Sequence, residues 1–258
     1  MQVSDKFIQN LARRAGSVLS SYFGRAHVVR TKKHPADVVT EADLAAEKLI
    51  TSEIWKRFPK HGIVAEESGN HFNGRDYVWY IDPLDGTFSF SRGTPIFCVM
   101  IGLVHKNQPI LSAIYDPMLE RLYFAKRGKG AFLNGKRIRC SSRKTWEYSF
   151  GASSVNLRRP DTRAYLSRLV RYAGKHPFWM SGFGSIGITG GYVACGTRDW
   201  YATRRCQDWE APSLALLLQE SGCKVTNVQG KPWKLGDTSI VAANKYLHPQ
   251  LLKLVRGK

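Results

Sequence analysis

The sequence lacks several features that would assign a protein to a class at once. No window approaches 18 uncharged apolar residues, and the N-terminus has no uninterrupted hydrophobic segment of the kind found in secretory signals. There is no G-x-S-x-G motif and no Cys–His pairing to suggest a covalent route to hydrolysis. These absences argue against a membrane-spanning protein, an exported protein and a serine or cysteine hydrolase.

The cysteines exclude two further classes. They are odd in number and widely spaced, with no C-x-x-C motif and no histidine at zinc-binding spacing: Cys98, Cys140, Cys195, Cys206 and Cys223. A zinc site or a disulfide framework is therefore not expected, whereas free thiols in a reducing compartment are. We expect a soluble, cytoplasmic protein.

Acidic residues are scarce relative to basic ones. The chain of 258 residues has 39 Lys and Arg against 20 Asp and Glu, which gives a formal net charge of +19. This charge favours anionic partners, either phosphorylated small molecules or nucleic acid. The basic residues form short dispersed clusters, such as Arg30–Lys33 and Arg204–Arg205, which a solvated surface would also show. Charge alone leaves these alternatives open.

Apolar periodicity predicts groups of helices and strands. Apolar residues recur at three- and four-residue intervals between Ser4 and Phe23, and a capping-box pattern at Thr40 opens a second helix that ends before Pro59. Short β-branched or aromatic runs between residues 77 and 125, separated by turn residues, predict a largely antiparallel meander of strands. Further helices are predicted around residues 162–172, 184–196, 209–222 and 249–255.

These patterns predict an α/β protein without internal repeats and without a clear linker. The polar stretch near residue 145 suggests a division into two parts. Residues 1–145 would form a half made of helices and an antiparallel sheet, and residues 146–258 an α/β half. We expect this boundary to separate two layers of one compact body.

Two aspartates stand at the end of an apolar run in the stretch Trp79–Gly93. Asp82 ends a predicted buried strand, and Pro83 and Gly86 make the chain turn at once, so Asp82 and Asp85 lie on a stiff loop. Such a turn can also exist only to fix a corner, with Asp82 accepting backbone N–H bonds. The presence of other acids in similar positions weakens this second explanation.

Three further groups of acids follow apolar runs or open helices. They are Glu66 with Glu67, Asp43, and Asp208 with Glu210. Each group has a structural explanation of its own, as solvated loop residues, as part of a capping box, or as a complement to a helix dipole. Directed together at one cleft, however, these acids would repel one another unless divalent cations neutralised them. Oxygen ligands of this kind suit Mg²⁺ beside a substrate phosphate.

The order of these motifs resembles the inositol monophosphatase family of Mg²⁺-dependent, lithium-sensitive phosphatases. The motifs are DVVTEAD (37–43), AEES (65–68), IDPLDGT (81–87) and WEA (209–211), the last before an apolar helix that ends in ESG. The resemblance covers most of residues 5–225. It implies a layered α-β-α-β-α sandwich of the inositol monophosphatase/fructose bisphosphatase type, and commonly a homodimer.

The resemblance also implies a role for each matching residue. Two or three Mg²⁺ ions would be held by Glu66, Asp82, Asp85 and Glu210, with the Leu84 backbone carbonyl completing the first site. Asp43 would support a further, weaker ion, partly through water. The attacking water would be oriented and activated by Glu66 and Thr87.

A second implied set binds the substrate. The backbone amides of Gly86 and Thr87 would face the phosphate, since N–H groups at a helix start favour an anion. The whole set consists of Asp85, Gly86, Thr87, Gly184, Ser185, Thr203 and Arg204.

Several positions depart from the family pattern, mostly on the substrate side. Glu210 stands where Asp is usual, and Asp208 is the alternative ligand if the register differs by two. Thr203 stands where inositol phosphatases carry a Glu that binds substrate hydroxyls, and Arg204 and Arg205 flank it. Loss of a carboxylate and gain of guanidinium groups shifts the expected substrate from a neutral polyol phosphate towards a more anionic phosphate ester.

The sequence thus predicts a Mg²⁺-dependent phosphomonoesterase that acts on a small phosphorylated metabolite through a metal-activated water. The substrate candidates are an inositol monophosphate-like compound, a sugar phosphate, histidinol phosphate and a nucleotide 3′-phosphate. The alternative is a catalytically weakened family member that binds nucleic acid or acts as a regulator, which the charge of +19 and the altered pocket motivate.

Overall fold

The computed structural model describes residues 3–32, 35, 37–72, 76–153 and 157–257. The helices within these ranges are α1 (Asp5–Tyr22), α2 (Glu41–Arg57), α3 (Thr87–Ser91), α4 (Pro160–Ala173), α5 (Ile186–Ala194), α6 (Ala211–Glu220) and α7 (His248–Arg256). Each long helix coincides with a helix predicted from the sequence to within a few residues.

The strands form one large sheet, one smaller sheet and a hairpin. The large sheet has the order β10 (Lys136–Ile138), β9 (Gly130–Leu133), β8 (Arg121–Lys126), β7 (Gln108–Asp116), β6 (Cys98–His105), β5 (Tyr77–Asp85), β3 (Gly62–Ala65) and β4 (Gly69–Phe72). The smaller sheet has the order β12 (Trp179–Ser181), β11 (Phe150–Ser153), β13 (Trp200–Thr203), β15 (Ile240–Ala243) and β14 (Lys224–Thr226). The hairpin pairs β1 (Val28–Thr31) with β2 (Val38–Thr40).

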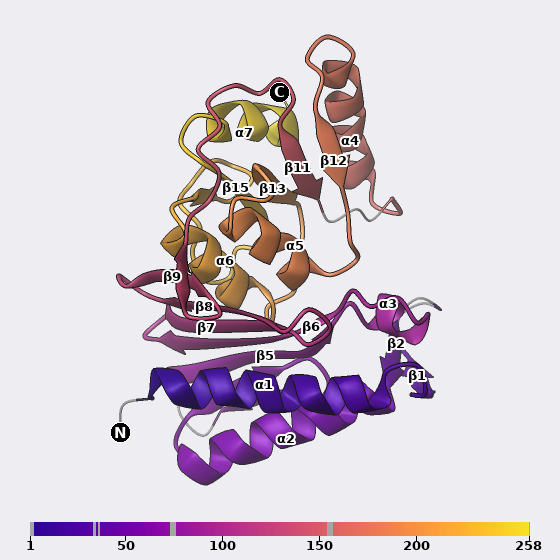
Figure 1. The fold of residues 1–258 in the computed structure, drawn as a ribbon, viewed down its shortest axis with the longest axis vertical. Helices are drawn as coiled ribbons and strands as arrows, with labels where there is room; N and C mark the ends of the chain where they lie inside the picture. The colour runs from indigo at the N-terminus through magenta and orange to yellow at the C-terminus, as the bar shows by residue number, and fades with distance from the viewer. Residues whose placement is uncertain (1–2, 33–34, 36, 73–75, 154–156, 258) are drawn as a thin grey trace.

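Helices and sheets alternate in five layers, which Figure 1 shows stacked one above another. α1 and α2 cover one face of the large sheet, and α5 and α6 pack between its other face and the smaller sheet. α4 and α7 cover the outer side of the smaller sheet. The predicted α-β-α-β-α architecture is confirmed.

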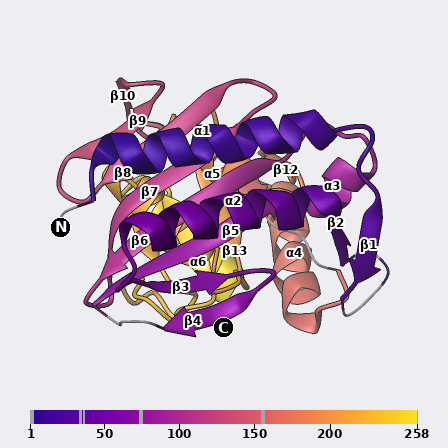
Figure 2. The same cartoon turned by 90° about the horizontal axis from the view of Figure 1, so that it is seen from below.

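The first helical layer follows from its caps and its apolar faces. The Ser4 hydroxyl accepts the Phe7 N–H at 3.2 Å at the start of α1, and Thr40 and Asp43 form the predicted capping box at the start of α2. The view from below in Figure 2 shows the two helices side by side across the sheet. Their apolar side chains and one face of β5, β6 and β7 make up a single buried cluster.

The large sheet is the predicted meander with one exception. Neighbouring strands from β5 to β10 run antiparallel, whereas β3 pairs with β5 in parallel. α2 precedes β3 along the chain, and a turn at residues 66–68 joins β3 to β4. As a result, the carboxyl ends of β3 and β5 lie at the same end of the sheet, where Glu66 follows β3 and Asp82 and Asp85 belong to the last residues of β5.

The two halves of the chain share a core. A second buried cluster joins β6, β7 and β8 to α5 and α6, and a third lies between the smaller sheet, α4 and α7. The predicted boundary at residue 145 falls in the irregular segment between β10 and β11.

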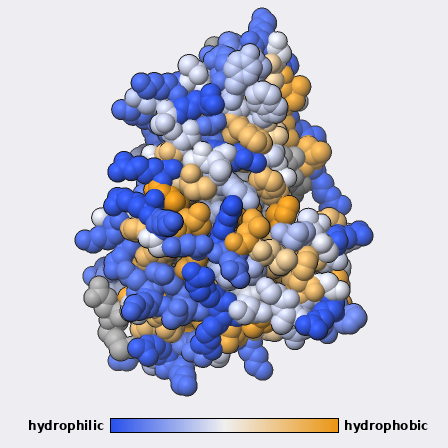
Figure 3. All heavy atoms as spheres, viewed as in Figure 1, coloured by the Kyte–Doolittle hydropathy of each residue, from blue (hydrophilic) through white to orange (hydrophobic). Residues whose placement is uncertain are grey.

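In Figure 3, hydrophilic side chains are spread over the whole face shown, with apolar ones in small groups between them.

Two further expectations can be compared with this fold. The five cysteines are free thiols, and three of them are buried. No helix within the described ranges is both long enough and apolar enough to cross a membrane.

Candidate metal centre and active site

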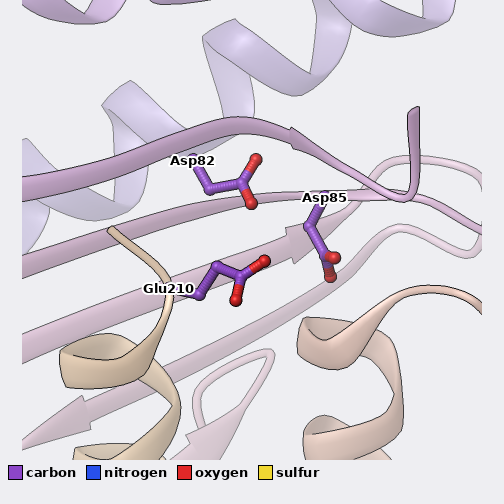
Figure 4. Close-up of side chains that lie close together, drawn as sticks. All are labelled: Asp82, Asp85 and Glu210. Atoms are coloured by element: carbon purple, nitrogen blue, oxygen red, sulfur yellow. The ribbon is translucent and has the colours of Figure 1, made fainter. Parts of the chain in front are cut away.

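Three carboxyl groups from distant parts of the chain meet between the two sheets. One oxygen atom from each of Asp82, Asp85 and Glu210 lies within 4.8 Å of the other two. Figure 4 shows the three side chains converging, Asp82 and Asp85 from the end of β5 and Glu210 from the residue that precedes α6. We call these three residues the acid cluster.

A bulge in β5 brings the two aspartates together. Residues three apart on a regular strand point to opposite faces of the sheet. Asp82 lies opposite Met100 of β6 and Asp85 lies opposite Cys98, so β5 has one more residue than β6 between the two pairs. The extra residue bends the strand and reorients the side chains that follow. Both carboxyl groups can therefore face Glu210.

Asp85 is held by the first turn of α5, a helix from the other half of the chain. Its carboxylate accepts the Ser185 hydroxyl at 2.6 Å, the Gly187 N–H at 2.6 Å and the Ile186 N–H at 3.1 Å. A Cβ atom on Gly187 would lie 2.5 Å from the Cys98 sulfur and 3.1 Å from an Asp85 carboxylate oxygen. Only glycine lets the helix approach Asp85 this closely.

Glu210, and not Asp208, belongs to the acid cluster. Glu210 caps α6, and its carboxylate accepts the Gln207 N–H at 2.8 Å. Asp208 is exposed and lines a separate cavity with Tyr80 and Trp233. The geometry therefore favours the register that places Glu210 in the site.

Burial and mutual repulsion make all three acids hard to ionise. Burial raises the pKa of Asp82 well above its usual range, and Glu66, Asp85 and Glu210 raise it further. Burial and then Asp85 likewise raise the pKa of Glu210. Burial also raises the pKa of Asp85, although the donors of α5 oppose this. In the part of the chain that the structure describes, no Lys, Arg or His forms an ion pair with the cluster.

Glu66 lies beside the acid cluster and binds a lysine. Lys32 Nζ lies 2.8 Å from Glu66 Oε1 and 2.6 Å from Glu67 Oε1, and Arg30 lies 3.1 Å from Glu67 Oε2. Burial raises the pKa of Glu66 to about 7, in spite of the opposing effect of the Lys32 ammonium group. Because Glu66 contributes to the raised pKa of Asp82, its charge is felt within the cluster.

Asp43, Leu84 and Thr87 form a hydrogen-bond network next to Asp82. The Thr87 hydroxyl lies 2.8 Å from the Leu84 carbonyl and 3.1 Å from an Asp43 carboxylate oxygen, and the Leu84 N–H donates to Asp82 at 3.0 Å. The other Asp43 oxygen accepts the Thr40 N–H at 2.8 Å. Burial raises the pKa of Asp43 to about 6.

A cavity of about 390 Å³ adjoins the acid cluster. Its lining residues are Ser153, Arg159, Thr162, Gly182, Gly184, Ile186, Thr203, Arg204, Arg205 and Gln207. The Ile186 N–H donates to Asp85, and the Gln207 N–H donates to Glu210. The cavity and the cluster therefore share a wall.

The structure places the predicted substrate residues in three positions. Gly184, Thr203 and Arg204 line the cavity. Ser185 is buried, and its hydroxyl donates to Asp85. Gly86 has a left-handed backbone with φ of 95° and begins α3, so its own amide and that of Thr87 open a short helix beside the cluster.

Sequence reasoning did not assign Lys32, Arg159 and Arg205 to the site. The basic run Arg30–Lys33, next to the motif that carries Asp43, was a signal for Lys32, but it also suited an exposed surface. Arg205 had been noted only as a neighbour of Thr203. Arg159 comes from α4 and had no local signal, because its place in the cavity depends on how the outer layer packs.

Comparison with known proteins agrees with this geometry. The profile of the inositol monophosphatase family matches residues 1–258. The chain is 30% identical to a fructose-1,6-bisphosphatase/inositol-1-monophosphatase of Thermotoga maritima over 96% of this chain and 94% of that protein. It is 33% identical to a Nus factor SuhB of Pseudomonas aeruginosa over 95% of this chain and 93% of that protein.

The fold has solved counterparts as well. The structure of an IMPase of Thermotoga maritima superimposes with a TM-score of 0.88 at 30% identity, over 97% of this chain and 95% of that one. The predicted family, layered fold and phosphatase class are thereby confirmed. The chain belongs to the inositol monophosphatase family of phosphatases.

Proposed function

We propose that this protein is a Mg²⁺-dependent phosphomonoesterase that hydrolyses a small phosphorylated metabolite. The substrate would be an inositol monophosphate-like compound, a sugar phosphate, histidinol phosphate or a nucleotide 3′-phosphate. One observation carries the proposal: Asp82, Asp85 and Glu210 come together within 4.8 Å from segments more than 120 residues apart in sequence.

The acid cluster has the chemistry of a divalent cation site. Its oxygen ligands are the kind that Mg²⁺ prefers. Its members are buried close together and raise one another's pKa, which would destabilise the folded protein unless a cation neutralised them. The residues therefore fit Mg²⁺.

The residues suggest where two or three ions would bind. Asp82, Asp85 and Glu210 would hold one ion. Glu66 and the Leu84 carbonyl would hold another together with the aspartates, and Asp43 would support a weaker one. When bound, Mg²⁺ would lower the pKa of the attacking water and neutralise charge on the phosphate and on the leaving oxygen.

Side chains around the cluster would handle the water and its proton. Glu66 lies beside the acid cluster, and its carboxylate would accept a proton from the attacking water. The Thr87 hydroxyl, fixed between Asp43 and the Leu84 carbonyl, would orient the water. The amides of Gly86 and Thr87, at the start of α3, would bind the phosphate oxygens.

Phosphate release tests the proposal. The wild-type protein should release phosphate only with Mg²⁺, and millimolar lithium should inhibit it. Asp85→Asn should abolish release, because it removes a charged ligand while the side chain keeps its shape. Asp76→Asn is a matched control, since Asp76 is exposed at the opposite end of β5. Activity of Asp85→Asn equal to that of the control would refute the proposal.

A second candidate function is binding of nucleic acid in a regulatory role. The net charge of +19 favours it, as does the likeness to a protein named as a Nus factor. Retention of RNA at about 150 mM salt by a protein that releases no phosphate from any ester would favour this function over hydrolysis.

We also propose a cytoplasmic homodimer. The five free thiols suit a reducing compartment, and the family resemblance suggests the dimer. Light scattering of the purified protein would measure its mass directly, and a mass near 29.1 kDa would contradict the dimer.

A further inference from the structure

We infer that the substrate carries a second anionic group on its leaving alcohol, and that Arg205 binds this group in the cavity beside the acid cluster. The inference rests on the proposed phosphatase function and specifies its substrate class. It follows from the charges of the cavity, from the way the arginines are held, and from the position of the cavity relative to the cluster.

The cavity is positively charged. Arg159, Arg204 and Arg205 line it, and none of the lining residues that the structure describes is acidic. The Asp161 carboxylate binds Arg159 through two contacts of 3.1 Å and lies 3.5 Å from Arg204 Nε. Asp161 thus offsets only one of the three guanidinium charges, and the side of the cavity that the arginines line is positively charged.

A turn after β13 presents the arginines. The Thr203 hydroxyl donates to the Arg205 carbonyl at 3.1 Å and accepts the main-chain N–H of Arg205 at 3.3 Å. The Thr203 side chain is buried, and its hydroxyl is used for these bonds to the main chain of Arg205. Thr203 therefore stabilises the turn that carries Arg204 and Arg205 into the cavity.

The three arginines differ in how much binding capacity remains. Arg159 is occupied by Asp161, and Arg204 donates to the Val255 carbonyl at 2.8 Å. The Arg204 Nε atom is buried and has no hydrogen-bond acceptor among the described residues. Arg205 is exposed, and over the described ranges its guanidinium group has no hydrogen bond or ion pair. Arg205 is therefore best placed to receive a ligand, with Arg204 next to it.

The position of the cavity relates this charge to the reaction. Its wall includes Ile186 and Gln207, whose N–H groups donate to Asp85 and Glu210. A phosphate ester bound at the cluster would therefore extend its leaving alcohol into the cavity. A second phosphate or a carboxylate on that alcohol would meet guanidinium groups, which bind both anions in a bidentate way.

Matched substrate pairs test the inference. Adenosine 3′,5′-bisphosphate and adenosine 3′-phosphate differ by one phosphate, and 3-phosphoglycerate and glycerol 3-phosphate differ by a carboxylate. With Mg²⁺ present, the ester that carries the second anionic group should have a kcat/KM about tenfold higher or more than its partner ester, in at least one of the two pairs. This is the effect expected of one charge-assisted hydrogen bond. The pair with the larger ratio identifies the second anion as phosphate or carboxylate.

Variants separate the cavity from the charge of the whole protein. Arg205→Ala should reduce the ratio by about tenfold or more, and Arg205→Lys should reduce it less. Arg171→Ala makes the same change of charge on the exposed side of α4, away from the cavity, and should leave the ratio as in the wild type. An equal effect of Arg205→Ala and Arg171→Ala would overturn the inference.

The outcomes also separate the inference from the proposed function. Hydrolysis of the esters with and without the second anionic group at equal efficiency would overturn the second-anion site and leave the phosphatase intact. Absence of phosphate release from all four esters, from myo-inositol 1-phosphate and from histidinol phosphate would overturn the proposed function itself.

Discussion

The acid cluster and the arginine-lined cavity share a wall but are built in different ways. In the cluster Asp82 and Asp85 are buried and Glu210 is half-buried, and their carboxyl groups are held by main-chain N–H groups of the β5 bulge, of the first turn of α5 and of the segment before α6. The cavity is open, and its arginines are held by one aspartate and one carbonyl, apart from Arg205. We therefore expect substitutions that disturb the backbone to alter the acid cluster, and substitutions of single side chains to alter the substrate preference proposed for the cavity.

The largest effect should come from removing a charge from the cluster. Glu210→Gln should lower kcat/KM by at least about 100-fold with Mg²⁺, because an expected ligand is lost. Asp208→Asn changes the same kind of charge two residues away, in a separate cavity, and should have little effect. The reverse order of the two variants would show that Asp208 is the ligand.

A smaller loss should follow when the backbone of the cluster is disturbed. Gly187→Ala would press a Cβ atom against Cys98 and Met100, shift the start of α5 and misplace Asp85. We expect about a 100-fold loss of activity at most and a destabilisation of roughly 1–3 kcal/mol, measured by assay and urea unfolding. Gly174→Ala, where only an ordinary contact of 3.5 Å would form, is the control. Full activity of Gly187→Ala would mean that α5 does not position Asp85.

Mg²⁺ should stabilise the cluster in a manner that depends on pH. The folded pKa values of Glu66 and Asp43 are raised to about 7 and about 6, so the folded protein retains protons there that the unfolded chain has released. Without metal, the stability that these groups provide at low pH is lost as the pH rises through 7. We expect a fixed concentration of Mg²⁺, equal to 100 times the Kd at pH 8, to raise the Tm by about 5 °C or more at pH near 8 and by less at pH near 5.5, where proton binding to the acids weakens metal binding. An equal rise at both pH values would contradict this.

The other half of the molecule should show the opposite pH dependence. His248 is buried against Thr226 in the outer layer, and burial lowers its pKa from 6.5 to about 4. Its contribution to stability is present above pH 6.5 and is lost as the pH falls through 4, because the unfolded chain takes up the proton first. The loss should amount to about 3 kcal/mol at most and should be absent in His248→Gln, as measured by urea unfolding. An unchanged pH profile in that variant would assign the loss to other groups.

Local sequence patterns predicted the parts of the site that are formed by residues close together in the chain. The capping box at Thr40 and Asp43 is formed by neighbouring residues, so a short motif was sufficient to predict it. The prediction that Asp82 ends its strand and lies on a loop with Asp85 was wrong, because β5 stays paired with β6 as far as Asp85 and bends through a bulge instead. The order of motifs then pointed to Glu210, and the structure places it with Asp82 and Asp85.

Contacts across long stretches of chain could not be predicted in this way. The bond from Ser185 to Asp85 spans 100 residues, and Lys32 reaches Glu66 across 34. The bond from the Ser185 hydroxyl to Asp85 is an addition to its predicted role in binding substrate, and no local motif indicated it. The sequence singles out Thr203 only because it stands where inositol phosphatases carry a Glu. Its observed role, which is to stabilise the turn after β13, depends on backbone geometry that no motif encodes.

The bonds from α5 to Asp85 mean that a fragment of the chain would not form the complete acid cluster. A fragment ending near residue 145 would include both aspartates of β5 but would lack Glu210 and the donors that orient Asp85. Such a fragment would present an incomplete set of ligands however well it folded. The acid cluster therefore depends on both parts of the chain, and neither part contains it alone.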